Sequence, residues 1–531
     1  MKYHTRKTLT AKLSALLQVV CLMICIPVSA VSPRSVLRTD RNEAEKTTAL
    51  NNAKYDYKIP VANQAEFDGI WDEVFKALNF GAKNILVSIK QGHYSFNERH
   101  IPIINRHYPE ANLRIEGNGS EIVSSRDEKA VYCQLDASSF SSHMVPVSAW
   151  GQWNQCGAPI DIYDEAKKIC RIPARGVSFV NGMMIQVSQW YETVICPVLK
   201  CDKNFIYFID KDLSYNPGRK CWSINEDIRF GGMMPRYRIF NPRIPADYVS
   251  KGATFLSLYG SEFESITISG LNFIGNRSEN ALMMIERFNG TAFVVSDCSF
   301  TNLSGDAIYI LSSNNVSICR NVFKQCERYA VWSDNLSNGT AISDNVFERM
   351  GQRIIYGGVV NCQGDRFTIS GNRFTDFPYA AIQLGNHYTS APTNRCVGIA
   401  ENNMIEYSES YIDDRYNCTL MDSGAIYVFT ICDDVVIRNN TIKNYTGKAK
   451  NRGIFCDDGA KNVTICGNVI EVLDGNDAVC LWYPDNVGEY VSDFCENNVV
   501  TDNVFINCKG SFEQKPGSNS VFKRNRYIKN K

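Results

Sequence analysis

The chain has 531 residues, with 56 basic and 56 acidic side chains and a formal net charge of zero. This length is ample for a large hydrophobic core, and no basic stretch exists that could follow a phosphate backbone, so nucleic acid is not an expected partner. The 20 cysteines show no CxxC pair and no Cys/His zinc spacing, so no metal or cofactor is predicted from them.

Residues 1–30 have the features of an export signal. A positively charged start is followed by an apolar stretch over 13–28 and by the small-residue cleavage site Val28-Ser29-Ala30. The sequence therefore predicts a secreted or periplasmic protein with no membrane span after signal cleavage. The alternative is an uncleaved membrane anchor, for which the apolar stretch is short.

Four further segments follow the signal. Residues 31–62 are polar and are predicted to be a flexible lead-in. Residues 63–124 are predicted to hold a capping helix over 63–79, where apolar residues follow a helical period, and then the first coils of a solenoid. Residues 125–252 contain strand-like runs but no repeating Asn, and we interpret them as a mostly β insertion. The main solenoid is predicted over 253–531.

The second half of the chain repeats one pattern: an aliphatic residue, two variable residues, Asn, one more residue, then Phe, Ile or Met. The Asn-to-Asn steps lie between 22 and 38 residues, and such a period is typical of a solenoid. Two apolar positions five apart flank a tight turn, and Asn tolerates the left-handed conformation there. The repeating positions are Asn321, Asn345, Asn372, Asn402, Asn440, Asn468, Asn503 and Asn525, with Cys298 in the same place one turn earlier.

This repeat predicts an all-β fold, a right-handed parallel β-helix in which each period is one coil. We expect each Asn side-chain amide to bond the equivalent Asn in the coils above and below, which forms a ladder at the spacing of neighbouring strands, ~4.8 Å. The competing solenoid is a leucine-rich repeat. That fold needs a frame dominated by Leu, whereas Val, Ile and Asn dominate here.

Each coil carries a second line, a small residue followed by an aliphatic residue, as in Ala381-Ile382 and Ala425-Ile426. Because side chains alternate along a strand, the residues between and beyond the buried positions are predicted to point outward in two rows. The first predicted row is Tyr309, Trp332, Val360, Gln383, Tyr427, Phe455 and Cys480. The second predicted row is Leu311, Asp334, Cys362, Gly385, Phe429, Asp457 and Trp482.

Outward rows this rich in rings indicate a surface that binds a sugar, because the C–H faces of a pyranose pack on aromatic planes. The alternative is that long loops cover the rings as a satellite core. The longest coils lie beside these rows, and their extra residues must leave the coil as loops, which often wall a groove. The candidate substrate-binding residues are His387, Arg415, Tyr427, Phe429, Trp482, Trp332 and Tyr309.

Three carboxylates are candidates for catalysis: Asp422, in Asp422-Ser-Gly-Ala-Ile-Tyr427, and Asp457 and Asp458, in Gly453-Ile-Phe-Cys-Asp457-Asp458-Gly459. These motifs, with Asn462-Val-Thr-Ile-Cys-Gly-Asn468 after them, resemble those of secreted bacterial β-helix glycoside hydrolases of the α-fucosidase and xylanase type, in the wider pectate-lyase-like superfold. The resemblance implies that Asp422 and either Asp457 or Asp458 form an acid/base pair. The chain departs from that family in having Phe455-Cys456 where a Tyr-Leu pair is usual, and it lacks the paired-Asp and Gly-His-Gly motifs of polygalacturonases.

Hydrolysis of a glycosidic bond needs one carboxylic acid to protonate the leaving oxygen and one carboxylate to act as base or nucleophile. The sequence therefore predicts a secreted glycoside hydrolase that acts on a polysaccharide or oligosaccharide. One alternative is a polysaccharide lyase or epimerase on the same scaffold, in which Asp433-Asp434 with Asp457-Asp458 could hold Ca²⁺. Another is a carbohydrate-binding protein or surface adhesin without catalysis. For Asp457-Asp458-Gly459, the structural alternative is a turn that ends the strand.

Overall fold

The structure is a computed structural model, and the residues it describes are spread from 55 to 529. They are residues 55–96, 110–124, 154–155, 161–164, 166–173, 177–180, 183–189, 192–209, 236–240, 255–259, 263–275, 281–303, 306–326, 328–351, 358–377, 379–385, 396–409, 423–429, 432–445, 451–457, 460–472, 476–482, 495–509, 511–513 and 519–529. The predicted export signal, residues 1–30, lies outside the described residues.

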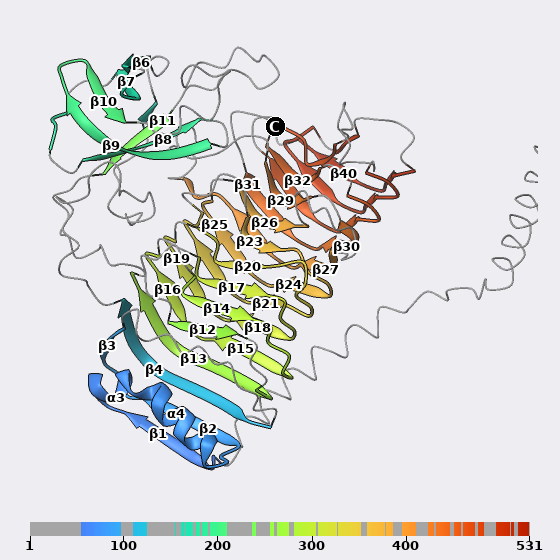
Figure 1. Ribbon diagram of the computed structural model, residues 1–531. Helices are drawn as coiled ribbons and strands as arrows, with labels where there is room; N and C mark the ends of the chain where they lie inside the picture. The colour runs from blue at the N-terminus through green and yellow to red at the C-terminus, as the bar shows by residue number, and fades with distance from the viewer. Residues whose placement is uncertain are drawn as a thin grey trace, which may run out of the picture. The chain divides into compact units, whose positions relative to one another are not determined.

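Three strands make up one coil of the main body, and the coils stack in chain order (Figure 1). One strand of each coil belongs to a ten-stranded sheet. Its members are β12 (Leu256–Tyr259), β14 (Met283–Glu286), β17 (Ile308–Leu311), β20 (Val331–Ser333), β23 (Gly358–Cys362), β26 (Ala380–Leu384), β29 (Gly424–Val428), β32 (Arg452–Cys456), β35 (Val479–Leu481) and β38 (Ser511–Glu513).

The other two strands of each coil lie on either side of a corner in a 23-stranded sheet. Before the corner come β15 (Ala292–Ser296), β18 (Val316–Cys319), β21 (Ala341–Ser343), β24 (Phe367–Ser370), β27 (Cys396–Glu401), β30 (Cys432–Arg438), β33 (Thr464–Cys466), β36 (Val499–Thr501) and β39 (Val521–Lys523). After it come β16 (Ser299–Thr301), β19 (Val322–Lys324), β22 (Val346–Glu348), β25 (Arg373–Thr375), β28 (Met404–Glu406), β31 (Thr441–Tyr445), β34 (Val469–Val472), β37 (Val504–Ile506) and β40 (Arg526–Ile528). Equivalent strands of successive coils pair in parallel, as β17 with β20 and β18 with β21 do, so the predicted parallel β-helix is confirmed.

The N-terminal end of the stack is closed by two short helices rather than the single helix expected over 63–79. Its elements are β1 (Tyr57–Val61), α3 (Gln64–Asp68), α4 (Ile70–Asn79), β2 (Asn84–Ile89), β3 (His93–Phe96) and β4 (Asn112–Ser124). Gly69 separates the helices, and the Asn63 side chain caps α3 by accepting a hydrogen bond from the Glu66 N–H. Strand β1 falls inside the segment expected to be a flexible lead-in, where it pairs with β2 and buries Ile59 and Val61.

The described strands between β4 and β12 form an antiparallel sheet of their own, with a separate hydrophobic core. Its members are β5 (Asn154–Gln155), β6 (Asp161–Asp164), β7 (Ile169–Pro173), β8 (Met184–Gln189), β9 (Glu192–Cys201), β10 (Phe205–Ile209) and β11 (Arg236–Phe240). Strand β4 pairs directly with β13 (Ser265–Ile274), and the Ser265 hydroxyl donates to Asn112 Oδ1 at 2.6 Å across 153 residues of sequence. The antiparallel strands are therefore an insertion between two neighbouring coils.

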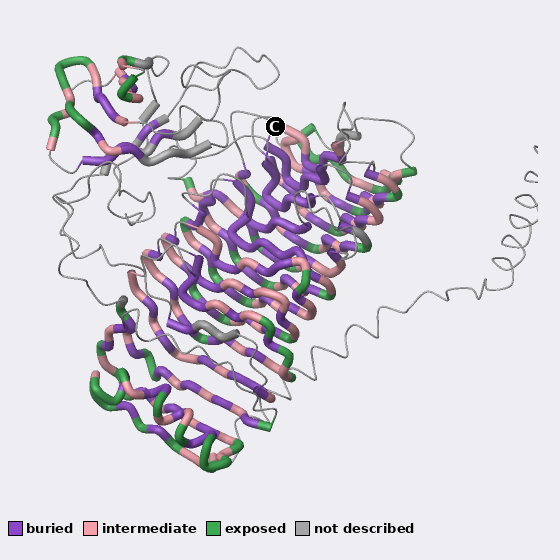
Figure 2. Tube along the Cα trace, in the orientation of Figure 1, coloured by how far each residue is buried: buried purple, intermediate pink, exposed green. Residues whose placement is uncertain are grey.

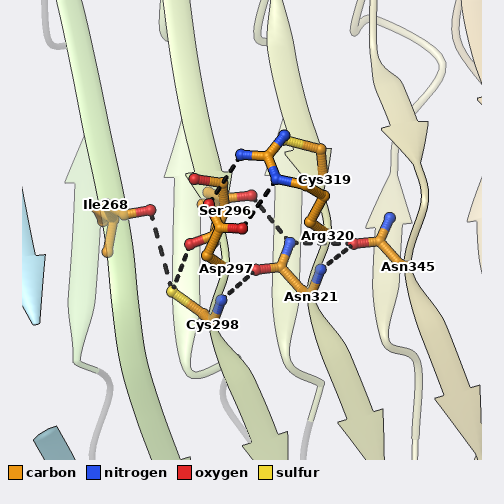
Figure 3. Close-up of polar contacts among 9 residues, drawn as sticks. Ile268, Ser296, Asp297, Cys298, Cys319, Arg320, Asn321 and Asn345 are labelled. Atoms are coloured by element: carbon orange, nitrogen blue, oxygen red, sulfur yellow. Dashed lines mark hydrogen bonds and ion pairs between the residues drawn. The ribbon is translucent and has the colours of Figure 1, made fainter. Parts of the chain in front are cut away.

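The corner of the large sheet is held by a ladder of buried Asn side chains. At each rung the side-chain oxygen accepts from the backbone N–H and the side-chain amide of the Asn one coil earlier. The side-chain amide donates to the Asn oxygen of the next coil and to a backbone carbonyl of the preceding coil. For Asn345 these distances are 2.9 Å to Asn372 Oδ1 from the backbone, 3.0 Å from the side chain, and 2.8 Å to the Ile318 carbonyl. Cys298 takes the first place, where its N–H donates to Asn321 Oδ1 at 2.9 Å (Figure 3).

Two details of the predicted ladder are wrong. The rung between Asn372 and Asn440 is Asn403, which bonds both of them, and not Asn402. The left-handed residue is also not the ladder Asn but the residue before it, as at Arg320 (φ 55°) and Asn402 (φ 56°). The sequence Asn402-Asn403 allowed either alignment, and burial decides it: a ladder Asn must reach inward, whereas the left-handed residue is exposed at the turn.

Much of the trace in the stacked coils is buried (Figure 2), and the buried apolar residues form one continuous core. Next to the ladder, five Phe rings stack with centroids 4.6–5.2 Å apart, the same spacing as the strands that carry them. The rings are those of Phe273, Phe300, Phe323, Phe347 and Phe374. Each buried ring contributes roughly 2–3 kcal/mol by transfer from water, so this column keeps successive coils in register.

Candidate functional site

The outward face of the ten-stranded sheet carries two rows of side chains, one residue from each coil. Strand pairing places the first row at Tyr309, Trp332, Asn361, Gln383, Tyr427, Phe455 and Cys480. Backbone hydrogen bonds continue the register two residues later and place the second row at Leu311, Asp334, Gln363, Gly385, Phe429, Asp457 and Trp482. The two rows define the candidate site.

The predicted rows were wrong at one coil. Val360 and Cys362 were expected to point outward in β23, but both are completely buried, and Asn361 and Gln363 take their places. Gly358-Val359 had the appearance of the small-aliphatic pair of the other coils, whereas Val360 is the residue that pairs with Ile382. Because side chains alternate, this error of one residue exchanged the two faces of the strand.

Asp457 lies at the end of β32 in a nearly dry setting. It is 7% exposed, and its carboxylate Oδ2 accepts a hydrogen bond of 2.5 Å from the hydroxyl of Tyr427, on the neighbouring strand β29. The Asp457 N–H donates to the Val428 carbonyl at 2.9 Å, so the backbone beside the carboxylate is part of the sheet. The Tyr427 hydroxyl and the sheet together fix the position of this carboxylate.

Aromatic rings surround the Tyr427–Asp457 pair. The Tyr427 ring is stacked with Phe429 at 5.4 Å between centroids and meets Phe455 edge-on at 5.2 Å. Tyr379, Ala380 and Cys480 complete this cluster, and Trp482 packs against it while remaining partly exposed. The rings remove water from around the carboxylate and leave one aromatic face, that of Trp482, partly open to solvent.

Arg452 brings a buried positive charge to the same strand. Its side chain is 4% exposed, with the guanidinium carbon 4.0 Å from the centre of the Phe455 ring and 6.0 Å from that of Trp482. Asp477 lies close enough to feel this charge: burial raises the pKa of the Asp477 carboxyl above its ordinary value, and Lys509 and Arg452 partly oppose that rise. Sequence reasoning did not select Arg452, and its only signal was a charged residue beside the Gly453-Ile454 pair of a buried strand.

The predicted site residues fall into three groups. Asp457, Tyr427, Phe429 and Trp482 lie together around one carboxylate. Tyr309 and Trp332 form a separate stacked pair, with ring centroids 4.3 Å apart and an angle of 8° between the planes. Asp422, Asp458, His387 and Arg415 lie outside the described residues.

Within the described part of the chain, no group of three or more His, Cys, Asp or Glu side chains could hold a metal ion. Of the residues considered for Ca²⁺, Asp433 and Asp434 belong to β30 of the large sheet, whereas Asp457 follows β32 of the ten-stranded sheet. The two strands therefore lie on different faces of the coil.

Comparison with known proteins identifies the solenoid. The model of a family described as "Right handed beta helix region" matches residues 249–397. The chain contains a right-handed β-helix. No curated protein matches the sequence significantly. No helix in the described part of the chain has the length and apolar character that a membrane crossing requires.

Solved structures of similar fold share little sequence with this β-helix protein. One titled "Glycoside hydrolase" is 9% identical with a TM-score of 0.43, over 89% of this chain and 96% of that one. The periplasmic alginate epimerase AlgG is 10% identical with a TM-score of 0.41, over 84% and 77% of the two chains. The Gp54 tailspike of Acinetobacter baumannii bacteriophage AP22, solved with a capsular saccharide, is 9% identical with a TM-score of 0.30, over 87% and 73%. At these values the likenesses carry no argument about activity.

Proposed function

We propose that this protein is a glycan-degrading enzyme, a glycoside hydrolase, whose catalytic centre is built around Asp457. The observation that supports this proposal is the Tyr427–Asp457 pair: a carboxylate 7% exposed, bonded at 2.5 Å and enclosed by rings on a sheet face. A carboxylate needed only to end a strand would lie in solvent at a turn. Holding it instead among rings, beside the partly open Trp482, is what a sugar-processing site requires.

The proposed chemistry uses two carboxylates. Asp457 would protonate the leaving oxygen or act as base or nucleophile, and its partner would be Asp422, because the sequence resemblance implies a pair of Asp422 with either Asp457 or Asp458. His387 and Arg415 are proposed as substrate-binding residues from the same coils. The Tyr427 hydroxyl would keep the Asp457 carboxylate in one orientation while the partly exposed Trp482, supported by the buried Phe429, packs on a C–H face of the sugar.

Substitution of Asp457 by Asn tests the catalytic role. We expect turnover of the best substrate from a panel of glycans to fall at least ~100-fold, because a positioned acid or base contributes about that much or more. Asp344→Asn is the matched control, since Asp344 is exposed in the left-handed turn of the large sheet, a conformation that Asn tolerates. Full activity in a folded Asp457→Asn variant would contradict the proposal.

Tyr427→Phe separates orientation from packing. The ring remains, but the hydrogen bond to Asp457 is lost, so we expect about a tenfold lower kcat and a shift of one limb of the pH–rate profile to higher pH, because the charged carboxylate loses a donor. A profile identical to that of the parent enzyme would show that this hydroxyl has no part in the reaction.

A polysaccharide lyase or epimerase is the second candidate, since a tyrosine bonded to a carboxylate is also a proton-transfer pair. A uronate substrate would need a cation or Ca²⁺ near its carboxylate, and the two outward rows contain no Lys, Arg or His. Unsaturated products that absorb in the near ultraviolet would decide for a lyase. Binding without turnover by both the parent protein and Asp457→Asn would instead indicate a carbohydrate-binding protein or adhesin. Residues 1–30 support export of the protein in each case.

A further inference from the structure

Three amide side chains fill the two coils between the Trp332 ring and the Tyr427–Asp457 pair. Asn361 and Gln363 lie on β23, and Gln383 lies on the next strand, β26. They are 2%, 7% and 7% exposed, so each is more than nine-tenths buried. We refer to these three residues as the amide band.

Each member of the amide band keeps one polar atom without a hydrogen-bond partner among the described residues. Gln363 Nε2 donates to Asn361 Oδ1 at 3.1 Å, and Gln383 Oε1 accepts from the Gly358 N–H at 3.1 Å. These bonds fix the three side chains. The atoms that keep no partner among the described residues are Asn361 Nδ2, Gln363 Oε1 and Gln383 Nε2. Two donor groups and one acceptor are therefore available here for hydroxyl groups of a ligand.

Beyond the amide band, the rings of Tyr309 and Trp332 are stacked face to face, and we refer to this stacked pair as the platform. The two rings are partly exposed, their centroids are 4.3 Å apart, and neither belongs to the buried ring cluster around Asp457. Pairing of Trp332 with Asn361, Gln383, Tyr427 and Phe455 in succession puts four strand steps between the platform and the strand of Asp457. At the usual strand spacing this separation is roughly 19 Å, which is more than a mono- or disaccharide spans.

The charges of the two rows restrict the ligand further. Only Asp334 and Asp457 are ionisable to a charge at neutral pH, and neither row contains a cation. Asp334 is occupied by the fold, because it accepts from the Ser312 N–H at 2.9 Å and the Ser337 hydroxyl at 2.6 Å. Arg452 lies against Phe455 and Trp482 but is only 4% exposed, so among the residues of the two rows a polyanion would meet the carboxylates of Asp334 and Asp457 and no cation. An uncharged chain of sugars would meet rings and amides.

We propose that the substrate of the enzyme is an uncharged polysaccharide that lies along the axis of the coils, from Asp457 across the amide band to the Tyr309–Trp332 platform. This inference rests on the proposed function for the reacting end of the chain. The platform packs on a sugar ring several units from the cleaved bond, and the amide band binds the hydroxyl groups between. The enzyme therefore needs a long substrate.

Affinity electrophoresis with the full-length Asp457→Asn protein tests binding without turnover. The gels contain one soluble polymer each: a neutral xylan, mannan, glucan or galactan, or an acidic polygalacturonate or alginate. We expect at least one neutral polymer to retard the protein, and Trp332→Ala in the same background to weaken this binding about tenfold by removing the platform. Trp332→Phe should restore most of the binding, and Tyr309→Ala should weaken it similarly. Phe80→Ala is the control, because Phe80 is 77% exposed in the N-terminal cap.

Gln363→Met tests the amide band with a side chain of similar length that lacks polar atoms other than sulfur. We expect Gln363→Met to bind the neutral polymer more weakly and the control variant Phe80→Ala to bind it as before. The proposal would be overturned if only the acidic polymers, or none of the polymers, retarded the protein. It would also be overturned if Asp457→Asn bound the neutral polymer equally well with and without Trp332→Ala.

The two proposals fail in different ways. If a neutral polymer binds through the platform but neither the parent protein nor Asp457→Asn turns it over, the hydrolase proposal is wrong and the extended binding site is supported. If turnover depends on Asp457 but is the same for short and long substrates, and the same with Trp332→Ala, the hydrolase proposal is supported and the extended binding site is wrong.

Discussion

The two sheets of the β-helix use the same coils in opposite ways. At the corner of the large sheet, successive coils repeat one solution, a buried Asn that bonds its neighbours on both sides. On the outward face of the ten-stranded sheet, the residue in one row changes from Tyr and Trp to Asn and Gln and then to Tyr and Phe. Repetition is what stacking requires, and the face where repetition stops is the one that we propose for binding.

The largest effect on stability is expected from the ladder. Asn403→Ala removes the acceptor of the Asn372 N–H and the donors to Ile369 and Asn440, all of which are buried. Each group left without a partner costs about 1–3 kcal/mol, so the free energy of unfolding should fall by about 3 kcal/mol or more, measured by denaturant unfolding.

The adjacent residue is a matched control for that prediction. Asn402 is exposed, with φ 56°, and takes no part in the ladder, so Asn402→Gly should change stability little. Equal losses in Asn403→Ala and Asn402→Gly would show that the corner depends on turn conformation and not on the side-chain ladder.

An intermediate effect on stability is expected in β32, the strand that positions Asp457. In β32, a Cβ on Gly453 would lie 2.4 Å from Ile470 Cγ2 and 2.5 Å from the Ala478 carbonyl oxygen, although most coils have Ala at this place. Gly453→Ala should therefore cost about 1–3 kcal/mol by overpacking, and it should also reduce activity because Asp457 ends the same strand. Both quantities can be measured on one preparation.

Gly69→Ala provides the comparison for the added methyl group. Between α3 and α4 the nearest atom to such a Cβ is the Ala65 carbonyl oxygen at 3.5 Å, an ordinary contact. Stability and activity should both stay close to those of the parent protein. A loss of activity in Gly453→Ala without a loss of stability would mean that the strand moves locally and that the core tolerates the methyl group.

The contrast between the sheets also explains what the sequence could reveal. The parallel β-helix was predictable because the spacing of Asn and apolar residues is imposed on almost every coil. Register within one coil was not, because Asn402-Asn403 and Gly358-Val359-Val360 each satisfy the pattern in two alignments. Only the burial of Asn403 and the pairing of Val360 with Ile382 distinguish them.

The candidate site was predictable in its strand positions but not in its contacts. Asp457 and Tyr427 were both selected as outward residues, yet their hydrogen bond joins strands 30 residues apart, and no local pattern specifies it. Asn361, Gln363 and Arg452 were missed. The first two were hidden by the register error in β23, and a buried Arg stacked on a ring has no sequence signature beyond its charge.

The smallest effect is expected at an exposed ion pair of the large sheet. Arg524 donates to both oxygens of Asp502 at 2.6 Å, and this pairing, helped by Thr501, lowers the pKa of Asp502 from 3.8 to about 2. The charged form is therefore favoured in the folded state, so the contribution to stability is present above pH 3.8 and disappears as the pH falls towards 2. Arg524→Asn keeps a residue that tolerates the left-handed turn and removes the charge.

In Arg524→Asn the pKa of Asp502 should rise towards 3.8, which carboxyl ¹³C titration by NMR would detect. Asp297, whose pKa is lowered by Arg320 at the other end of the stack, should titrate as before and serves as an internal control. Unfolding at neutral pH should scarcely change, because exposed ion pairs are screened by solvent. A large loss of stability at neutral pH would mean that these outer pairs, and not only the buried Asn ladder, hold successive coils together.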